Sequence, residues 1–178
     1  MSSCKYTNIT VMGDTASGKT SIIVKYIHNI FTENYISTSF TKLYKHGEYL
    51  NIHEYIDVRD HAINCKNVHG VMIVYDIHNQ ESYHNINNWI NECYRYYPSH
   101  IPIIVCGTKS DLSGGEIYKY ENEEGDKMKT FIVSAKTGES ISDAFTFLLD
   151  QINKQYIVAR IKQHEKNTDK NKKWCVLM

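Results

Sequence analysis

The strongest constraint on the fold is a glycine loop between an apolar segment, Ile9–Met12, and a segment with helical periodicity. The loop reads Gly13-Asp14-Thr15-Ala16-Ser17-Gly18-Lys19-Thr20, which satisfies the pattern G-x-x-x-x-G-K-[ST]. Its glycines let the backbone wrap closely around a phosphate, and N–H groups at a helix start point at the anion. In this pattern Lys19 reaches the terminal phosphates, the Thr20 hydroxyl ligates Mg²⁺, and Ser21 completes the predicted binding segment. A chance glycine loop is the alternative, but the strand-to-helix context favours a site for a nucleoside triphosphate.

Apolar strands and periodic helices alternate along the rest of the chain. Continuous apolar runs at Val71–Tyr75, Ile101–Cys106 and Phe131–Val133 are typical of buried parallel strands. Residues 45–48 predict a hairpin turn, and apolar residues recur at helical spacing near 22–27, 83–94 and 141–152. The alternation predicts an α/β fold with a mostly parallel sheet of six strands and helices on both faces. Ligands of such sheets bind at the carboxyl ends of the strands.

Charge and cysteine content exclude several classes of protein. Lys plus Arg number 20 and Asp plus Glu number 20, so the chain lacks the positive excess that whole-surface binding of nucleic acid needs. The five cysteines form no C-x-x-C pair, which favours a reducing compartment over a disulfide framework or a zinc site. No apolar stretch reaches the length of a membrane span. We therefore expect a cytoplasmic monomer that does not bind nucleic acid.

A second motif, Thr108-Lys109-Ser110-Asp111, follows the apolar strand that ends at Cys106. A carboxylate at Asp111 accepts from both N1–H and the exocyclic amino group of guanine, a pair of donors that adenine lacks on that edge. Lys109 packs its aliphatic stem along the plane of the base. When this motif is taken alone, an ordinary charged surface turn explains it better, so its weight comes from its combination with the glycine loop.

At these residues the chain resembles the Ras superfamily of small GTPases, over roughly residues 5–160. Its guanine motif, [NT]-K-x-D, is similar to Thr108–Asp111, and its S-A-K loop, whose backbone contacts the guanine oxygen, is similar to Ser134-Ala135-Lys136. The resemblance implies that Phe31 stacks on the base and that Thr38 binds Mg²⁺ when the γ-phosphate is present. It also implies that Asp57 holds Mg²⁺ through water. Short segments resemble both Rab and Rho proteins, and the resemblance implies a single P-loop G domain over residues 1–160.

The second switch segment departs from the family pattern D-x-x-G-Q and reads Asp57-Val58-Arg59-Asp60-His61. Asp60 replaces the glycine that meets the γ-phosphate, and His61 stands where the glutamine orients the attacking water. Because phosphoryl transfer depends on positioning and charge stabilisation, we predict slow hydrolysis of GTP to GDP. In this prediction Lys19 and Thr38 stabilise charge and His61 is the candidate for orienting water. A pseudo-GTPase scaffold that holds GTP intact is the alternative, and an ATP-dependent P-loop kinase is disfavoured by the guanine motif.

The last four residues, Cys175-Val176-Leu177-Met178, match the prenylation signal C-a-a-X, and the final methionine favours farnesyl on Cys175. Upstream, five lysines from Lys162 to Lys173 against two acidic residues leave a charge of +3. At about 1 kcal/mol per basic charge near an anionic leaflet, this charge contributes about 3 kcal/mol to membrane binding. We therefore expect residues 161–178 to be a lysine-containing, lipidated tail at the cytoplasmic face of a membrane. There the GTPase would signal to effectors in vesicle traffic or cytoskeletal regulation, under an exchange factor and a GTPase-activating protein.

Overall fold

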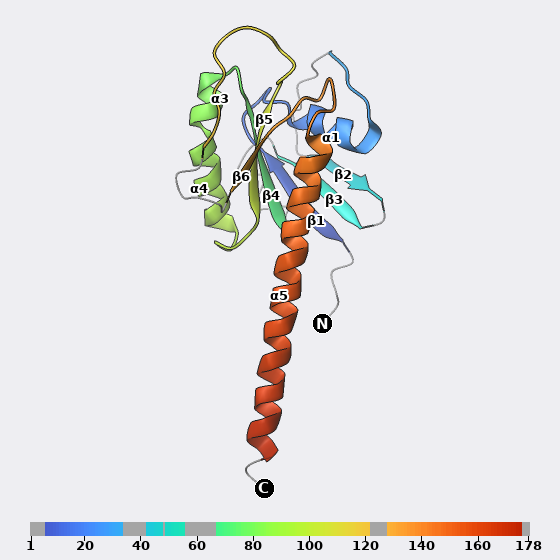
Figure 1. The fold of residues 1–178 in the computed structure, drawn as a ribbon, viewed down its shortest axis with the longest axis vertical. Coiled ribbons are helices and arrows are strands. Elements are labelled where there is room, and N and C mark those ends of the chain that lie inside the picture. The colour runs from blue at the N-terminus through green and yellow to red at the C-terminus, as the bar shows by residue number, and fades with distance from the viewer. Residues whose placement is uncertain (1–5, 34–41, 48, 56–66, 122–127, 176–178) are drawn as a thin grey trace.

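The computed structural model describes residues 6–33, 42–47, 49–55, 67–121 and 128–175, with the side chains of the last segment described through residue 159. Its centre is a six-stranded sheet in the order β2-β3-β1-β4-β5-β6 (Figure 1). The strands are β1 (Thr7–Met12), β2 (Lys42–His46), β3 (Leu50–Glu54), β4 (Gly70–Asp76), β5 (Ile103–Thr108) and β6 (Lys129–Ile132). All neighbouring strands are parallel except the hairpin of β2 and β3. The predicted α/β sheet is confirmed, including its single antiparallel pair.

Four described helices cover the two faces of the sheet: α1 (Lys19–His28), α3 (Gln80–His84), α4 (Ile86–Tyr96) and α5 (Ile141–Cys175). Helices α1 and α5 pack on one face and α4 on the other, because their apolar residues belong to two separate buried clusters. Figure 1 shows these helices on opposite sides of the strands. The strands supply both clusters by alternation. On β4, for example, Met72 and Val74 face α1 and α5, whereas Val71 and Ile73 face α4.

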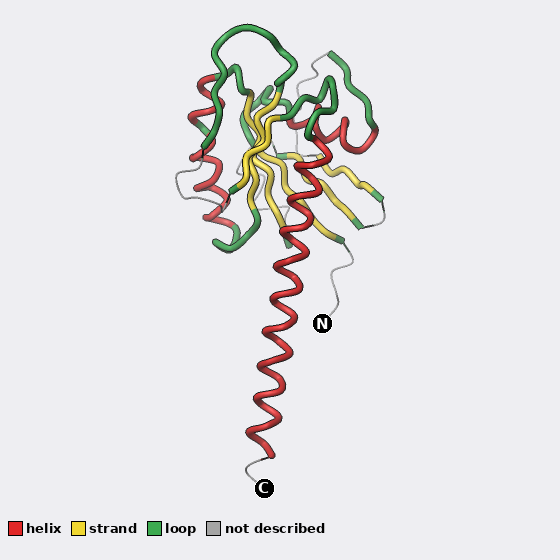
Figure 2. The backbone as a smooth tube through the Cα atoms, in the orientation of Figure 1, coloured by secondary structure: helices red, strands yellow, loops and turns green. Residues whose placement is uncertain are grey.

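The turns of the fold follow local sequence signals. The predicted hairpin turn contains Gly47 at φ +61°, a left-handed conformation that favours glycine. Asn79 caps α3 by accepting a hydrogen bond at its side-chain oxygen from the backbone N–H of Ser82, over 3.0 Å. The long loops after β5 and β6 lie at the same end of the sheet as the glycine loop after β1 (Figure 2). This is the carboxyl end of the parallel strands, where a ligand was expected.

Between β5 and β6, the described residues form no helix, and a tyrosine-rich segment lies against the α3 side of the sheet. The Tyr75 hydroxyl donates to the backbone oxygen of Tyr118 over 3.1 Å and accepts from the backbone N–H of Tyr120 over 3.1 Å. The ring of Tyr83 on α3 lies 5.6 Å from the ring of Tyr118. These contacts hold the loop that follows the guanine motif against the body of the domain.

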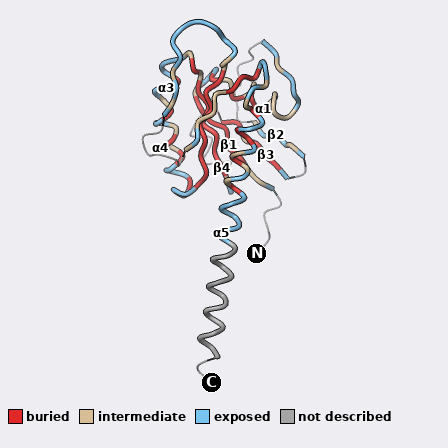
Figure 3. Tube along the Cα trace, in the orientation of Figure 1, coloured by how far each residue is buried: buried red, intermediate tan, exposed pale blue. Residues whose placement is uncertain are grey.

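Helix α5 has 35 residues, or about 50 Å of length. Its buried face ends at Ile152, and Tyr156, Ile157 and Val158 are exposed. Figure 3 shows the described end of this helix as exposed, and in Figure 1 the backbone continues as one helix past the predicted boundary at residue 160 and projects away from the sheet. None of the helices within the described residues combines the length and the apolar character that crossing a membrane requires.

Candidate functional site

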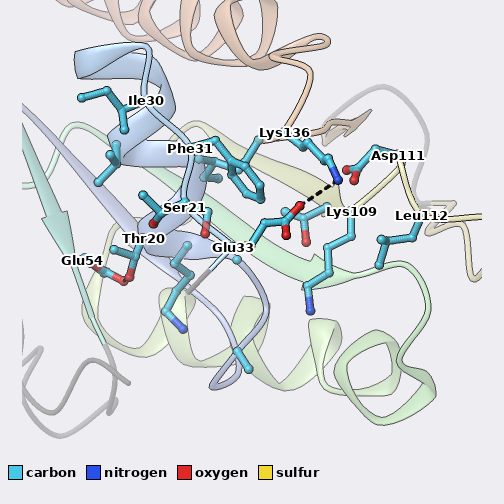
Figure 4. A pocket seen from close by; sticks show the side chains of 18 of the residues that line it. Thr20, Ser21, Ile30, Phe31, Glu33, Glu54, Lys109, Asp111, Leu112 and Lys136 are labelled. Atoms are coloured by element: carbon cyan, nitrogen blue, oxygen red, sulfur yellow. Dashed lines mark hydrogen bonds and ion pairs between the residues drawn. The ribbon is translucent and has the colours of Figure 1, made fainter. Parts of the chain in front are cut away.

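A cavity of about 540 Å³ opens at the carboxyl end of the sheet (Figure 4), within the size range of small-ligand sites. Loops from β1, α1, β5 and β6 meet around it. Most of the sequence-predicted site residues line it: Thr15, Ala16, Gly18, Lys19, Thr20, Ser21, Phe31, Thr108, Lys109, Asp111, Ala135 and Lys136. Four other predicted residues are next to these lining residues in the chain: Gly13, Asp14, Ser17 and Ser134. Thr38, Asp57 and His61 lie outside the described residues.

The glycine loop has the backbone geometry that the sequence predicted. Gly13 has φ +144°, and a Cβ there would lie 2.0 Å from the backbone oxygen of Val74, so no other residue fits. Gly18 has φ +96° and is the N-cap of α1. The Nζ of Lys19 donates to the backbone oxygens of Gly13, over 2.8 Å, and Asp14, over 2.7 Å. The loop therefore closes around a buried ammonium group.

Burial lowers the pKa of Lys19, while the carboxylates of Glu54 and Asp14 act in the opposite direction. A charged ammonium in this position is short of compensating negative charge. A phosphate at the mouth of the loop supplies such charge, and the N-terminus of α1 adds its own attraction for an anion.

The side chain of Asp14 points away from the cavity, toward α4. Its Oδ1 accepts from the indole Nε1 of Trp89 over 2.7 Å, and its Oδ2 accepts from Nδ2 of Asn85 over 2.8 Å. Only the backbone of Asp14 is therefore available to a nucleotide. The side chain anchors the glycine loop to α4, a role that sequence reasoning did not find.

The predicted base-reading loop is tied to the glycine loop. Thr108 is 2% exposed, and its Oγ1 lies 2.6 Å from the backbone oxygen of Ser17. Lys109 forms an ion pair with Asp76 at 2.6 Å. Asp111 accepts a hydrogen bond from the hydroxyl of Ser134 over 2.6 Å and lines the cavity (Figure 4). Ser134 thus fixes the carboxylate while leaving it further acceptor capacity for a base.

An ion pair crosses the cavity mouth beside Phe31. The Nζ of Lys136 lies 2.9 Å from Oε1 of Glu33, drawn as a dashed line in Figure 4. This hydrogen bond raises the pKa of Lys136. It joins the loop after α1 to the loop after β6. Glu33 was missed by the sequence analysis because nothing local to it indicates a partner more than one hundred residues away.

Glu54 is a second residue that the sequence analysis missed. It ends β3, is 1% exposed, and accepts a hydrogen bond at Oε1 from the Thr20 hydroxyl. The Tyr44 hydroxyl donates to Oε2 of Glu54 over 2.8 Å. Burial of Tyr44 is the main cause that raises its pKa above the usual range, and the hydrogen bond to Glu54 is the second cause. One signal was readable: Glu54 shares the buried face of its strand with Leu50 and Ile52. A carboxylate on an otherwise apolar face needs a polar partner.

The phosphate end of the cavity fits a magnesium ion. Mg²⁺ prefers oxygen ligands and is commonly held by one or two carboxylates together with substrate phosphates. The hydroxyl of Thr20 and the carboxylate of Glu54 supply such oxygens beside Lys19, which faces the expected phosphates. The donor chemistry is therefore that of a metal–phosphate site.

A phosphate-binding loop and a base-reading loop at two ends of one cavity define the class: an α/β P-loop protein that binds a nucleotide. Comparison with known families agrees, since the model described as Ras family matches residues 8–154. The chain therefore belongs to the Ras family and is a small GTPase.

Three relatives are named as Ras-related or GTP-binding proteins. It is 27% identical to the Ras-related protein RabZ of Dictyostelium discoideum, over 83% of this chain and 72% of the relative. It is 23% identical to the Ras-related protein RIC1 of Oryza sativa subsp. japonica, over 81% of this chain and 79% of the relative. It is 24% identical to the GTP-binding protein YPTM2 of Zea mays, over 77% and 75%.

Proposed function

We propose that this small GTPase is a Mg²⁺-dependent guanine-nucleotide switch that hydrolyses GTP slowly and acts at the cytoplasmic face of a membrane. The observation that carries the nucleotide assignment is Asp111, which lines the cavity and is held by Ser134 at 2.6 Å. Lys19 and Thr20 line the same cavity. The proposal therefore has one ligand spanning both loops, with its base at Asp111 and its phosphates at Lys19.

Each residue of the cavity has a distinct part in this proposal. The N–H groups of the glycine loop bind the β- and γ-phosphates, and Lys19 neutralises the charge that develops as the terminal bond breaks. Mg²⁺, which Thr20 and Thr38 would help to hold, would supply charge stabilisation to the transferred group. Thr20 donates an oxygen to the metal, and Thr38 contributes a second hydroxyl in the GTP state. Phe31 and Lys109 enclose the base.

Slow hydrolysis follows from the second switch. When the family pattern D-x-x-G-Q is started at Asp57, the segment Asp57–His61, which lies outside the described residues, has an aspartate and a histidine where the family has a glycine and a glutamine. A negative charge near the γ-phosphate opposes binding, and loss of the water-orienting amide slows attack. A hydrolysis-defective scaffold is the second candidate function, and it rests on the same substitutions.

A single-turnover experiment separates the slow GTPase from the hydrolysis-defective scaffold. Purified protein is loaded with GTP and Mg²⁺, and the bound nucleotide is followed by chromatography over several hours. Steady appearance of GDP supports a working, slow GTPase. GTP that stays intact supports the scaffold. Failure to bind any guanine nucleotide, with the fold retained by circular dichroism, would overturn the whole proposal.

The proposed membrane anchor rests on Cys175 and the tail lysines. One lipid chain binds a membrane only marginally, so the basic charge acts as the second signal. The Rab name of one relative, RabZ, supports a role in vesicle traffic through effectors and an exchange factor. Farnesyl transfer to the full chain, followed by flotation with vesicles containing phosphatidylserine, tests this part. A Cys175→Ser variant should stay with the soluble fraction, and equal flotation of both proteins would exclude the anchor.

A further inference from the structure

Lys42 is a positively charged residue that lines the same cavity as the glycine loop. It begins β2, at the edge of the sheet, and its side chain is half-buried. Side chains alternate along a strand, so Lys42 shares a face of β2 with Tyr44, which packs against the cluster that contains α1. Leu43 and Lys45 point to the other face and are exposed. The alternation therefore turns Lys42 toward the cavity.

Strand register brings Lys42 level with the glycine loop. Lys42 pairs with Glu54 on β3, and Glu54 pairs with Val11 on β1, two residues before Gly13. These paired residues form one row across the end of the sheet that carries the loop. The Cβ atoms of directly opposed residues on antiparallel strands lie about 5 Å apart, so Lys42 lies beside Glu54. Because Glu54 accepts a hydrogen bond from the Thr20 hydroxyl, Lys42 also lies near the phosphate end of the cavity.

The order of the strands gives the cavity a direction. Figure 4 shows Asp111 on one side of the cavity and Glu54 beside Thr20 on the other. A nucleotide with its base at Asp111 and its phosphates at Lys19 runs from β5 toward β1, and further phosphates continue toward β3 and β2. Neighbouring strands are about 4.8 Å apart, so β2 lies about 10 Å beyond β1, and the four-carbon stem of lysine covers much of that distance. The terminal phosphate is therefore the part of the ligand nearest to Lys42.

The charges at the phosphate end favour an additional phosphate. Among the described residues that line this end, Lys19 and Lys42 carry two positive charges against the one carboxylate of Glu54. Charges in a partly buried site are screened less by salt than charges on an open surface. GTP brings negative charge to this end that GDP lacks, so the surplus positive charge favours GTP.

We propose that Lys42 determines nucleotide specificity: its ammonium group binds the terminal phosphate and makes the cavity prefer GTP over GDP. The contact is a charge-assisted hydrogen bond from Nζ to a phosphate oxygen, and GDP has no such oxygen at that position. The inference rests on the proposed function, because the phosphates have to lie at Lys19. A lysine on an edge strand can also act by discouraging pairing with other strands, a role that needs no nucleotide.

The test compares the release of two nucleotides from the full-length protein, with no hydrolysis involved. Wild type and variants are loaded with a fluorescent GDP analogue or a fluorescent, non-hydrolysable GTP analogue at one Mg²⁺ concentration, and dissociation rates are followed. A hydrogen bond to a charged group changes an equilibrium by about tenfold, so Lys42→Gln should release the GTP analogue about tenfold faster. Its GDP release should stay within about twofold of wild type. Lys42→Arg, which keeps the charge, should stay within about threefold for both nucleotides.

Lys45 offers a matched control on the same strand. It is exposed, points to the opposite face, and pairs with Asn51 instead of Glu54. Lys45→Gln removes the same charge and should change either release rate by less than about twofold. Circular dichroism melts check that each variant is folded. If Lys42→Gln does not fold, Lys42→Thr, whose β-branched side chain suits a strand, takes its place.

An equal ratio of the two release rates in wild type and Lys42→Gln would overturn the inference. That ratio also stays equal if both nucleotides leave faster by the same factor, because the lost contact then does not involve the terminal phosphate. The same loss of GTP preference in Lys45→Gln would overturn it too, since total charge rather than position would then be responsible. In each case the proposed function stands, because the wild type binds both nucleotides. A wild type that binds neither nucleotide refutes the proposed function itself, and the inference with it.

Discussion

The hydrogen bond between Thr108 and the glycine loop offers the sharpest test of how the two halves of the site cooperate. Thr108→Val keeps nearly the same shape and removes the hydroxyl, whose Oγ1 lies 2.6 Å from the backbone oxygen of Ser17. Thr108 and Ser17 are 2% and 1% exposed. The carbonyl therefore loses a donor in a place that water reaches poorly.

The expected cost follows from the burial of both partners. A neutral hydrogen bond is worth about 1 kcal/mol net, and a buried group that loses its partner costs more, so we expect about 1–2 kcal/mol. For a domain of this size that loss corresponds to a fall in melting temperature of about 2–8 °C. If about 1 kcal/mol of this loss destabilises the nucleotide-bound state relative to the free state, GDP dissociates about fivefold faster.

A matched variant exists on β1. Thr10 is 0% exposed, but its Oγ1 lies 3.5 Å from the Tyr97 hydroxyl, at the limit of a hydrogen bond. Thr10→Val should therefore change stability by less than about 0.5 kcal/mol and leave GDP release unchanged. Thermal melts and release of a fluorescent GDP analogue report both quantities. The reasoning fails if Thr108→Val matches the wild type in both assays, or if Thr10→Val is equally damaging.

Three further predictions concern contacts elsewhere in the domain. Glu33→Gln removes the exposed ion pair with Lys136, so GDP release at low salt should accelerate by about twofold. The release rate should also lose its dependence on salt concentration, and a rate that depends on salt as in the wild type contradicts this prediction. Trp89→Phe removes the donor to Asp14 and should lower the free energy of unfolding by about 1–2 kcal/mol in urea titrations, where equal midpoints would argue against the anchor. Burial lowers the pKa of His69, so the folded state binds fewer protons than the unfolded state. The contribution of His69 to stability should therefore be full above a pH of about 6.5 and be lost as the pH falls below it, and His69→Gln should flatten that loss.

The fold was largely readable because its signals are local. Continuous apolar runs such as Val71–Tyr75 have the composition of strands buried on both faces, and β4 has that position at the centre of the sheet. The glycine loop was readable for the same reason: Gly13 and Gly18 sit at positive φ values that other residues rarely adopt. Helix α5 was harder, because no cap or proline marks where its periodic face ends, and its backbone runs on to Cys175.

The residues that contact the motif side chains from distant segments could not be predicted from the sequence in the same way. Motif residues such as Asp111 carry a recognisable spacing, whereas the partners that orient them come from distant segments. The Lys136–Glu33 pair spans one hundred and three positions, and Glu54 is thirty-four positions from Thr20. Sequence spacing says nothing about such pairs, because strand register and loop packing bring them together.

Short segments of the amino-acid sequence thus carry the P-loop pattern, the guanine motif, the alternation of strand and helix, and the C-a-a-X pattern at Cys175. The contacts of Glu54, at the end of β3, belong to the folded molecule. By counting from the family motif, the chain itself points to Asp57. By pairing Glu54 with Val11, the sheet places Glu54 against Thr20. The physical reason is that contacts are defined by distances in space, and strand register sets those distances whereas spacing along the sequence does not.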